Sequence, residues 1–228
     1  MRKFVVLLSS GLDSTVNLYA AQAQGEVVLA LTFDYGQRAA EKEIAAAKAI
    51  THRLKIPHRV LELPFFKDLG KSSLLDASLE LPTGDKVSID DKNTSEKSAQ
   101  SVWVPNRNGI FLNIAAGFAE SLRADAVIPG FNQEEAATFP DNSKAFLQAL
   151  TASFGYSTAN HVKVECFTTE MVKVQIVEAG KKWGVDWSLM WPCYQSLAKW
   201  CGECESCQRS KRAFKAAHVD TADLFLID

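Results

Sequence analysis

The chain has 228 residues, of which 47% are hydrophobic and 23% charged, and its formal net charge is −2 at pH 7. This length can bury a core and is most economically one domain, with room for a small appendage. The composition and the slightly acidic balance indicate neither intrinsic disorder nor a strongly basic surface for nucleic acid. We therefore expect a globular protein without a direct nucleic-acid partner.

The first 63 residues alternate between short apolar runs and helical patterns. Residues 4–8 are apolar, but a run of five is shorter than the roughly 7–15 residues of a secretory signal core, so it indicates a buried strand. A helix is expected at 14–23, a strand at 27–33, a helix at 39–54 and a strand at 59–63. This alternation predicts an α/β fold with a doubly wound parallel sheet and right-handed crossovers.

From residue 64 to about 102 the sequence is rich in Ser, Asp, Lys and Gly and has no regular period. A loop this long tends to be a lid or a mobile segment, so we expect poor order over 83–100 without ligand. Beyond it, helices are expected at 110–124, 144–154 and 169–183, and strands at 125–130 and 161–166. No apolar run approaches the roughly 20 residues of a membrane-spanning helix, so no membrane attachment is expected.

The turn between the first strand and the first helix is a candidate nucleotide site. Ligands of open parallel sheets collect beyond the carboxyl ends of the strands, and small residues there let backbone N–H groups converge on an anion. Asp13 beside bound phosphates makes sense chiefly as a Mg²⁺ ligand. The alternative is that Ser9, Ser10 and Asp13 merely cap the helix. The candidate nucleotide-binding residues are Leu8, Ser9, Ser10, Gly11, Leu12, Asp13, Ser14 and Thr15.

Four of the five cysteines follow the spacing C-x7-C-x2-C-x2-C near the C-terminus. In a reducing compartment this cluster indicates metal ligands, so we expect a cytosolic protein. Four sulfurs in a closed shell define a structural tetrahedral Zn²⁺ site, and Gly202 helps the chain to fold back. An iron–sulfur cluster and unbound thiols are the alternatives. The candidate ligands are Cys193, Cys201, Cys204 and Cys207, in a zinc-binding region expected at 191–228 beside a main domain at 1–190.

The loop sequence SSGLDST resembles the S-G-G-x-D-S loop of the N-type ATP pyrophosphatases, with Ser10 in place of the first glycine. Together with the four cysteines, it is similar to the 7-cyano-7-deazaguanine synthase family of queuosine biosynthesis. The resemblance spans nearly the whole chain. Its further segments are 35–38 (YGQR), 104–108 (VPNRN), 130–132 (GFN), 139–141 (FPD), 186–189 (DWSL) and 191–207.

The resemblance implies an adenine nucleotide alpha hydrolase-like fold and an ATP-dependent carbon–nitrogen ligase. Its substrates would be 7-carboxy-7-deazaguanine and ammonia, with ATP and Mg²⁺, and the family suggests a homodimer. Adenylation of the acid would allow ammonia to form an amide, and adenylation of the amide oxygen would lead to the nitrile. Asp13, Lys173 and Arg38 would assist through charge, although Lys and Arg side chains are most often solvated.

Polar residues after the third and fourth predicted strands are candidates for binding the deazaguanine ring. They lie at the expected ligand-binding edge of the sheet. A turn-forming role is the alternative for Asn132 and Asp141. The candidates are Arg107, Asn108, Asn132, Glu134 and Asp141.

Three other functions remain open from the sequence. A relative could adenylate the same acid for attachment to a protein. A tRNA-modifying relative would need a catalytic cysteine pair and a basic surface. A non-catalytic, zinc-dependent binding module would not bind ATP·Mg²⁺.

Overall fold

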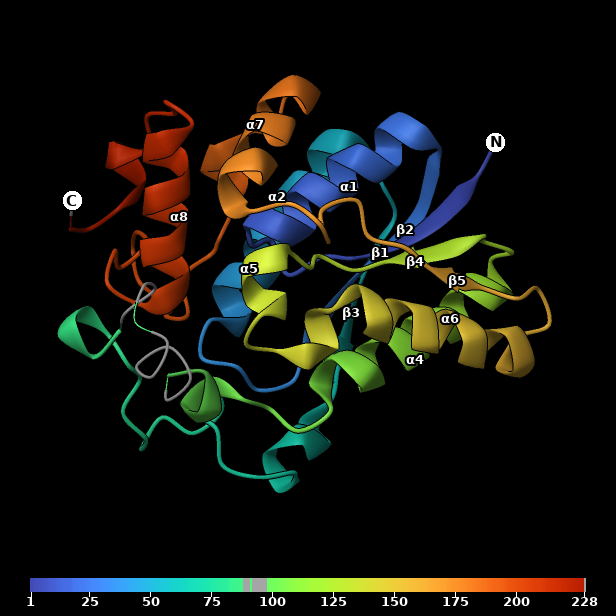
Figure 1. Cartoon of the computed structure of the whole chain (residues 1–228), viewed down its shortest axis with the longest axis horizontal. Coiled ribbons are helices and arrows are strands. Elements are labelled where there is room, and N and C mark those ends of the chain that lie inside the picture. Colours follow the sequence, from blue (N-terminus) through green and yellow to red (C-terminus); the bar gives the residue numbers. More distant parts are fainter. Residues whose placement is uncertain (88–90, 92–97, 228) are drawn as a thin grey trace.

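The computed structural model describes residues 1–87, 91 and 98–227. In these ranges the chain forms a five-stranded sheet of order β3-β2-β1-β4-β5, in which every neighbouring pair is parallel (Figure 1). The doubly wound parallel sheet that the sequence predicts is therefore confirmed. The strands are β1 (Lys3–Leu7), β2 (Glu26–Asp34), β3 (His58–Glu62), β4 (Ala126–Ile128) and β5 (Lys163–Val164).

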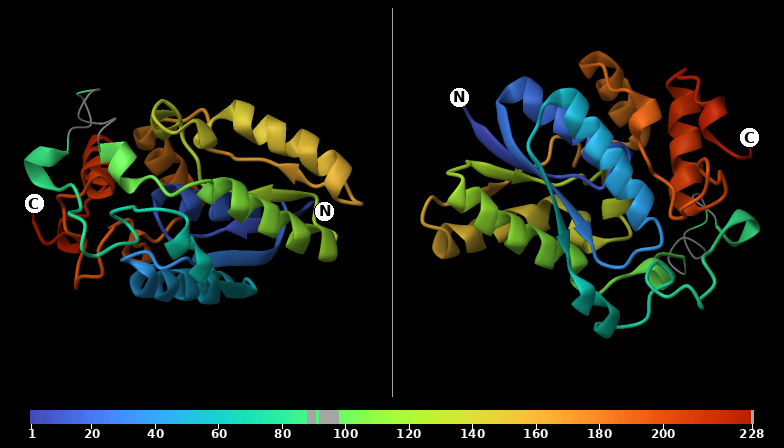
Figure 2. Two further views of the ribbon diagram at one scale, coloured as in Figure 1. Left: turned by 90° about the horizontal axis from the view of Figure 1, so that it is seen from below. Right: turned by 180° about the vertical axis from the view of Figure 1, so that it is seen from behind.

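Helices cover both faces of the sheet (Figure 2). One face carries α1 (Leu12–Gln24), α2 (Ala40–Leu54) and α7 (Lys173–Trp183), and α8 (Glu205–Ala216) packs against α7. The other carries α4 (Arg107–Ser121) and α6 (Lys144–Ser157). The short elements are α5 (Gln133–Ala136), η1 (Pro64–Asp68), η2 (Gly84–Lys86), η3 (Pro140–Asn142), η4 (Trp187–Leu189) and η5 (Ala222–Leu224).

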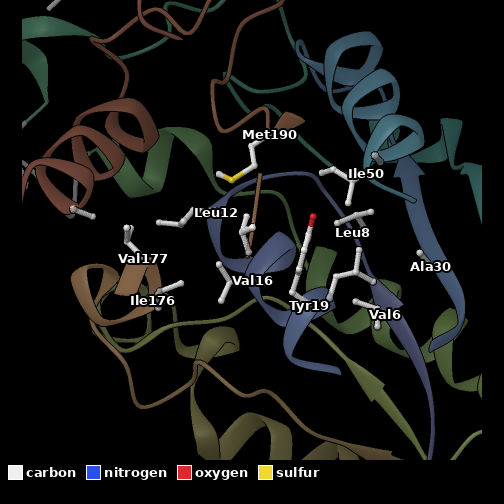
Figure 3. Packing of buried hydrophobic residues seen from close by; sticks show 14 of the residues in the cluster. Val6, Leu8, Leu12, Val16, Tyr19, Ala30, Ile50, Ile176, Val177 and Met190 are labelled. Carbon is white, nitrogen blue, oxygen red and sulfur yellow. The ribbon is translucent and has the colours of Figure 1, made fainter. Parts of the chain in front are cut away.

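The central strand β1 is apolar throughout because both of its faces are buried. Phe4 and Val6 belong to the hydrophobic cluster beneath α1 and α7, whereas Val5 belongs to the cluster beneath α4. Successive side chains of a strand point to opposite faces, so a continuous apolar run is what a doubly covered sheet requires. On the first face, Val16 of α1 and Ile176 of α7 are fully buried in the same cluster (Figure 3).

The C-terminal region joins this cluster. Trp200 and Phe214 are buried in it, and their rings stack with centroids 6.3 Å apart. The sequence did not predict α8. Its buried residues include the polar Glu205, Arg209 and Ser210, so its apolar signal is weak.

The long segment after β3 contains η1, η2 and turns, and residues 98–102 are helical. It contacts the metal-ligand region, because Thr83 forms a β-bridge with Cys204 and the Gly84 N–H donates to the Glu203 carbonyl at 3.2 Å. Poor order is expected over 83–100, and half of that range, residues 88–90 and 92–97, lies outside the described residues. No helix in the described ranges combines the length and the apolar character needed to cross a lipid bilayer.

Candidate active site

A cavity of about 250 Å³ lies at the carboxyl ends of the central strands. Residues that follow β1, β2 and β4 line it, which is where a parallel sheet is expected to bind ligands. Most of the predicted site residues reach its wall: Leu8, Ser9, Gly11, Leu12, Asp13, Ser14, Arg38, Arg107, Asn108, Asp141 and Lys173. Ser10, Thr15, Asn132 and Glu134 do not line it.

The loop between β1 and α1 leaves the helix N-terminus open to an anion. The N-cap residue of α1 is Gly11, which has no side chain to cover the first backbone N–H groups. Ser10 is fully buried, and its hydroxyl donates to the carbonyl oxygens of Ser9 at 2.6 Å and Glu43 at 3.1 Å. Its own carbonyl accepts the Trp191 N–H at 2.9 Å. The loop is thus fixed from α2 and from the C-terminal region, and it can bind phosphate oxygens through its amides.

Close approach of the chain at Gly130 completes this end of the cavity. A Cβ at position 130 would lie 2.4 Å from the backbone nitrogen of Ser14. Only glycine therefore allows the turn after β4 to lie against the start of α1.

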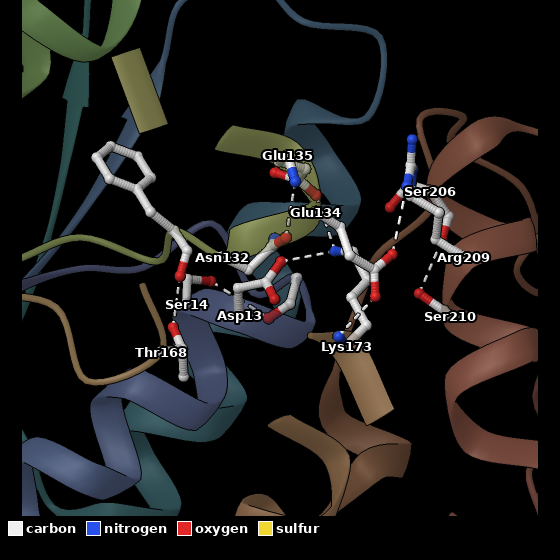
Figure 4. A network of polar contacts seen from close by, with 12 residues as sticks. Asp13, Ser14, Asn132, Glu134, Glu135, Thr168, Lys173, Ser206, Arg209 and Ser210 are labelled. Carbon is white, nitrogen blue, oxygen red and sulfur yellow. Dashed lines mark hydrogen bonds and ion pairs between the residues drawn. The ribbon is translucent and has the colours of Figure 1, made fainter. Parts of the chain in front are cut away.

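The centre of the site is a buried ion-pair cluster of Lys173, Asp13 and Glu135 (Figure 4). The Lys173 ammonium lies 2.8 Å from Asp13 Oδ2 and 2.8 Å from Glu135 Oε1, and the lysine side chain is 4% exposed. The sequence predicted Lys173 and Asp13, but not Glu135. Lys173 is therefore a buried, paired residue of the site and not a solvated surface charge.

Two carboxylates share a single cation in this cluster. Burial disfavours the charge on Lys173, but Asp13 and Glu135 outweigh it and raise the pKa of the lysine above its ordinary value. Burial raises the pKa of Asp13, against the opposing effect of Lys173, and Glu135 adds to the rise. Asp13 Oδ1 is buried and has no hydrogen-bond partner among the described residues. An oxygen ligand in an anionic environment is therefore available for a metal cation.

Glu134 holds the backbone of the same lysine. Its Oε1 accepts the Lys173 N–H at 2.8 Å, and its Oε2 lies 3.4 Å from Arg209 Nη1 and 3.3 Å from Arg212 Nη2. Asn132 caps α5 by accepting the Glu135 N–H at 2.9 Å. The predicted substrate ligands Glu134 and Asn132 thus lie behind the ion-pair cluster and shape it.

A second wall of the cavity is formed around Arg107. Arg107 Nη1 donates to the Tyr35 hydroxyl at 3.2 Å, and its guanidinium lies over the Tyr35 ring at 5.7 Å from the centroid. Beside it, Asn108 Nδ2 donates to Asp141 Oδ2 at 2.9 Å. Burial raises the pKa of Asp141, while Arg107 opposes the rise. These groups offer a cation, an amide and a carboxyl to a flat polar ligand.

Glu43 is a further carboxyl group on the cavity wall that the sequence did not indicate. Gln37 Nε2 donates to Glu43 Oε2 at 2.8 Å, and Gln37 is itself held by the backbone of Phe33 and Tyr35. Burial raises the pKa of Glu43 to about 7, against the opposing hydrogen bond from Gln37 and the charge of Arg107.

Arg38 lines the cavity but donates its side-chain hydrogen bonds to a neighbouring turn. Its Nη2 donates to the carbonyl oxygen of Asp76 at 2.8 Å and to that of Leu79. Arg38 Nε is buried without a partner among the described residues. The guanidinium thus holds the segment after β3 against the site in this structure.

The four predicted metal ligands come together near the cavity. The Sγ atoms of Cys193, Cys201, Cys204 and Cys207 lie within 4.8 Å of one another, and all four residues are buried. Backbone N–H groups donate to two of these sulfurs, including Cys201 N to Cys193 Sγ and Cys204 N to Cys201 Sγ, at 3.3–3.4 Å. Gly202 has φ +82°, the left-handed conformation that the tight turn needs. The site can hold one metal ion in a closed four-sulfur shell.

Several cavity residues were not among the predicted site residues, because the pattern of a segment does not show which of its side chains face a cavity. They belong to the turn after β2, to α2, to α5 and to the region around the cysteines. Glu135 and Arg209 could have been suspected only as neighbours of predicted residues. The lining residues that were not among the predicted site residues include Tyr35, Glu43, Glu135, Trp191, Tyr194, Glu205, Ser206 and Arg209.

Comparison with known proteins agrees with the resemblance seen in the sequence. The family described as "Queuosine biosynthesis protein QueC" matches residues 3–218. The 7-cyano-7-deazaguanine synthase of Bdellovibrio bacteriovorus is 61% identical over 225 residues, covering 98% of this chain and 97% of the relative. The enzymes of the same name from Pelotomaculum thermopropionicum and Desulforamulus reducens are 51% and 49% identical, and cover 93% and 98% of this chain and 96% and 98% of their own. The chain therefore belongs to the QueC family.

Proposed function

We propose that this chain is an ATP-dependent ligase that converts 7-carboxy-7-deazaguanine and ammonia to 7-cyano-7-deazaguanine. The observation that carries the proposal is the meeting of three groups in one cavity: the open N-terminus of α1, the Lys173 cluster and the polar wall at Arg107. Relatives named for this activity match nearly the whole chain, which supports the same chemistry here.

The reaction requires two activations of the same carbon. In the first, a carboxylate oxygen attacks the α-phosphorus of ATP and pyrophosphate leaves. Ammonia then attacks the acyl carbon and loses a proton, and AMP departs with the oxygen to give the amide. In the second, the amide oxygen attacks the α-phosphorus of another ATP and pyrophosphate leaves, and loss of AMP and of both amide N–H protons gives the nitrile. One acid and one ammonia thus consume two ATP and release two AMP and two pyrophosphates.

The protein supplies position and charge, and no protein nucleophile is needed. The amides around Gly11 would bind phosphate oxygens at the helix N-terminus. The Lys173 ammonium, held in place by Asp13 and Glu135, would stabilise negative charge that develops on the phosphates. Arg107, Asn108 and Asp141 would orient the ring of the substrate. Arg38 would act by holding the segment at 76–79 beside the cavity.

Two metal ions fit the residues of this chain. Asp13, with its unpartnered Oδ1, would be a Mg²⁺ ligand, and Mg²⁺ would neutralise charge on the triphosphate. The four cysteine sulfurs suit Zn²⁺, and a closed shell leaves no open position for activating water. We therefore assign the zinc to folding. The region at 191–228 would be a zinc-binding extension of the domain at 1–190, since α8 shares its core.

The remaining features of the proposal are the partners and the compartment. The family suggests a homodimer, free ammonia as the nitrogen donor and no direct contact with nucleic acid. A zinc site made of four clustered cysteines would suit the reducing cytosol.

The direct test is incubation of the purified protein with ATP, Mg²⁺, ammonium and 7-carboxy-7-deazaguanine, followed by mass spectrometry. We expect the nitrile, with two AMP for each nitrile. Formation of the acyl adenylate without amide or nitrile would favour a relative that transfers the acid elsewhere. Failure to bind ATP·Mg²⁺ would favour a zinc-dependent binding module.

A further inference from the structure

A chain of polar contacts connects the metal-ligand helix α8 to the nucleotide loop. Cys204, a metal-ligand candidate, is the N-cap residue of α8, and Glu205 and Arg209 follow on its first turns. Arg209 is 7% exposed, and its Nε and Nη2 lie 3.1 Å and 2.9 Å from Glu205 Oε1. The contacts with Glu205 therefore fix the orientation of the guanidinium within its own helix.

From this fixed position Arg209 contacts the carboxylate that holds Lys173. Arg209 Nη1 lies 3.4 Å from Glu134 Oε2, and the other oxygen of Glu134 accepts the Lys173 backbone N–H at 2.8 Å (Figure 4). Lys173 is the first residue of α7, and its ammonium pairs with Asp13 in the nucleotide loop. The two carboxylate oxygens of Glu134 thus contact different elements: Oε2 contacts Arg209 of α8, and Oε1 accepts the N–H of Lys173 at the start of α7.

We infer that Arg209 is a positioning residue for Lys173, acting through Glu134, so that the metal-ligand helix sets the place of the lysine in the nucleotide site. Glu134 is a flexible side chain with two rotatable bonds beyond Cβ, and it can hold the start of α7 only if its outer oxygen is held as well. A part-buried, charged contact with a pre-organised guanidinium provides that constraint.

Arg209 also lines the cavity, so direct contact with the substrate carboxylate is the competing role. The two roles predict different losses. A positioning residue affects nucleotide binding and turnover together with Glu134, whereas a substrate ligand affects chiefly the affinity for the acid.

The test is a mutant cycle with R209Q, E134Q and the double variant. Binding of a non-hydrolysable ATP analogue with Mg²⁺ and binding of the acid are each measured by calorimetry, beside turnover. We expect each single variant to weaken binding of the analogue about tenfold, and the double variant to lose little more than either single one. Affinity for the acid should change less than about twofold in R209Q.

The matched control is R212Q, because Arg212 belongs to the same helix and contacts the same oxygen of Glu134 but is 42% exposed. Its effect on analogue binding should stay below about twofold. Metal content and thermal melting of every variant identify loss of folding. If R209Q does not fold, E134Q alone decides, because the inference requires the same tenfold loss from it.

Additive losses, unchanged analogue binding in E134Q, or a large loss of acid affinity in R209Q would overturn the inference. It rests on the proposed function only in assigning Lys173 to the nucleotide phosphates. If the unmodified protein makes no nitrile, the proposed function fails, and the binding cycle still tests the coupling.

Discussion

The ion-pair cluster at Lys173 and the sulfur cluster at the cysteines are both buried, but they differ in what completes them. Lys173 already has two protein carboxylates as partners, so its charge is paired by protein groups alone. The four cysteine sulfurs lie within 4.8 Å of one another, and backbone N–H groups donate to two of them. Buried thiolates in that arrangement need a cation. We therefore expect perturbation of the first cluster to affect chemistry and perturbation of the second to affect folding.

Removal of the metal should have the largest effect. A chelator or Cys207→Ser should destabilise the fold by at least about 4 kcal/mol, because metal binding is folding free energy for a site of this kind. The affected structure would be α8 and the core that it shares with α1 and α7. Metal analysis and thermal melting measure it. The fifth cysteine provides the control: Cys166→Ser, outside the cluster, should cost only about 1 kcal/mol. Equal losses in the two variants would contradict the difference between the clusters.

Asp13→Asn should have the opposite effect: it should lower turnover strongly and leave the stability of the fold nearly unchanged. Turnover should fall on the order of 10³-fold, because the variant removes a charge from the nucleotide site. Lys173 keeps Glu135 as a partner, and the metal content and melting temperature should stay close to those of the unmodified protein. Asp223→Asn, at an exposed position, serves as the control. Retained turnover in Asp13→Asn would remove Asp13 from the mechanism.

The carboxyl group of Glu43 on the cavity wall should make the stability of the protein depend on pH. Its pKa in the folded state is raised to about 7 by burial, whereas an ordinary glutamate has 4.5. Between these values the folded state binds the proton more tightly than the unfolded state, so stability falls as the pH rises through this window. Glu43→Gln removes this loss. The variant should gain about 1–3 kcal/mol relative to the unmodified protein between pH 4.5 and pH 8.

Denaturant unfolding at the two pH values measures the gain from Glu43→Gln. Glu41→Gln is the matched control, because Glu41 lies on the same turn of α2 and is exposed. An equal pH dependence in both variants would show that the cavity does not perturb Glu43.

The two clusters were not equally predictable. The cysteine cluster follows from spacing alone, since three of the four ligands lie within seven residues. The sheet and the loop before α1 follow from continuous apolar runs and from small residues at a strand end. The Lys173 cluster joins three elements that are far apart in sequence, and its member Glu135 lies in a four-residue helix without a periodic signal. Helix α8 was missed because its buried face is partly charged.

The smallest effect expected concerns Ser10, where the loop differs from the pattern of the ATP pyrophosphatases. Ser10 has φ +60°, in the left-handed region that costs a residue with a Cβ on the order of 1 kcal/mol. Its hydroxyl donates to the Glu43 carbonyl at 3.1 Å, and a buried hydrogen bond returns about 1 kcal/mol. Ser10→Gly should therefore change the free energy of unfolding by less than about 1 kcal/mol, because the strain relieved offsets the bond lost. Ser10→Ala keeps the strain and loses the bond, so it should be the less stable of the two by about 1 kcal/mol in denaturant unfolding. If the alanine variant is as stable as the glycine variant, the positive φ at Ser10 carries no measurable strain.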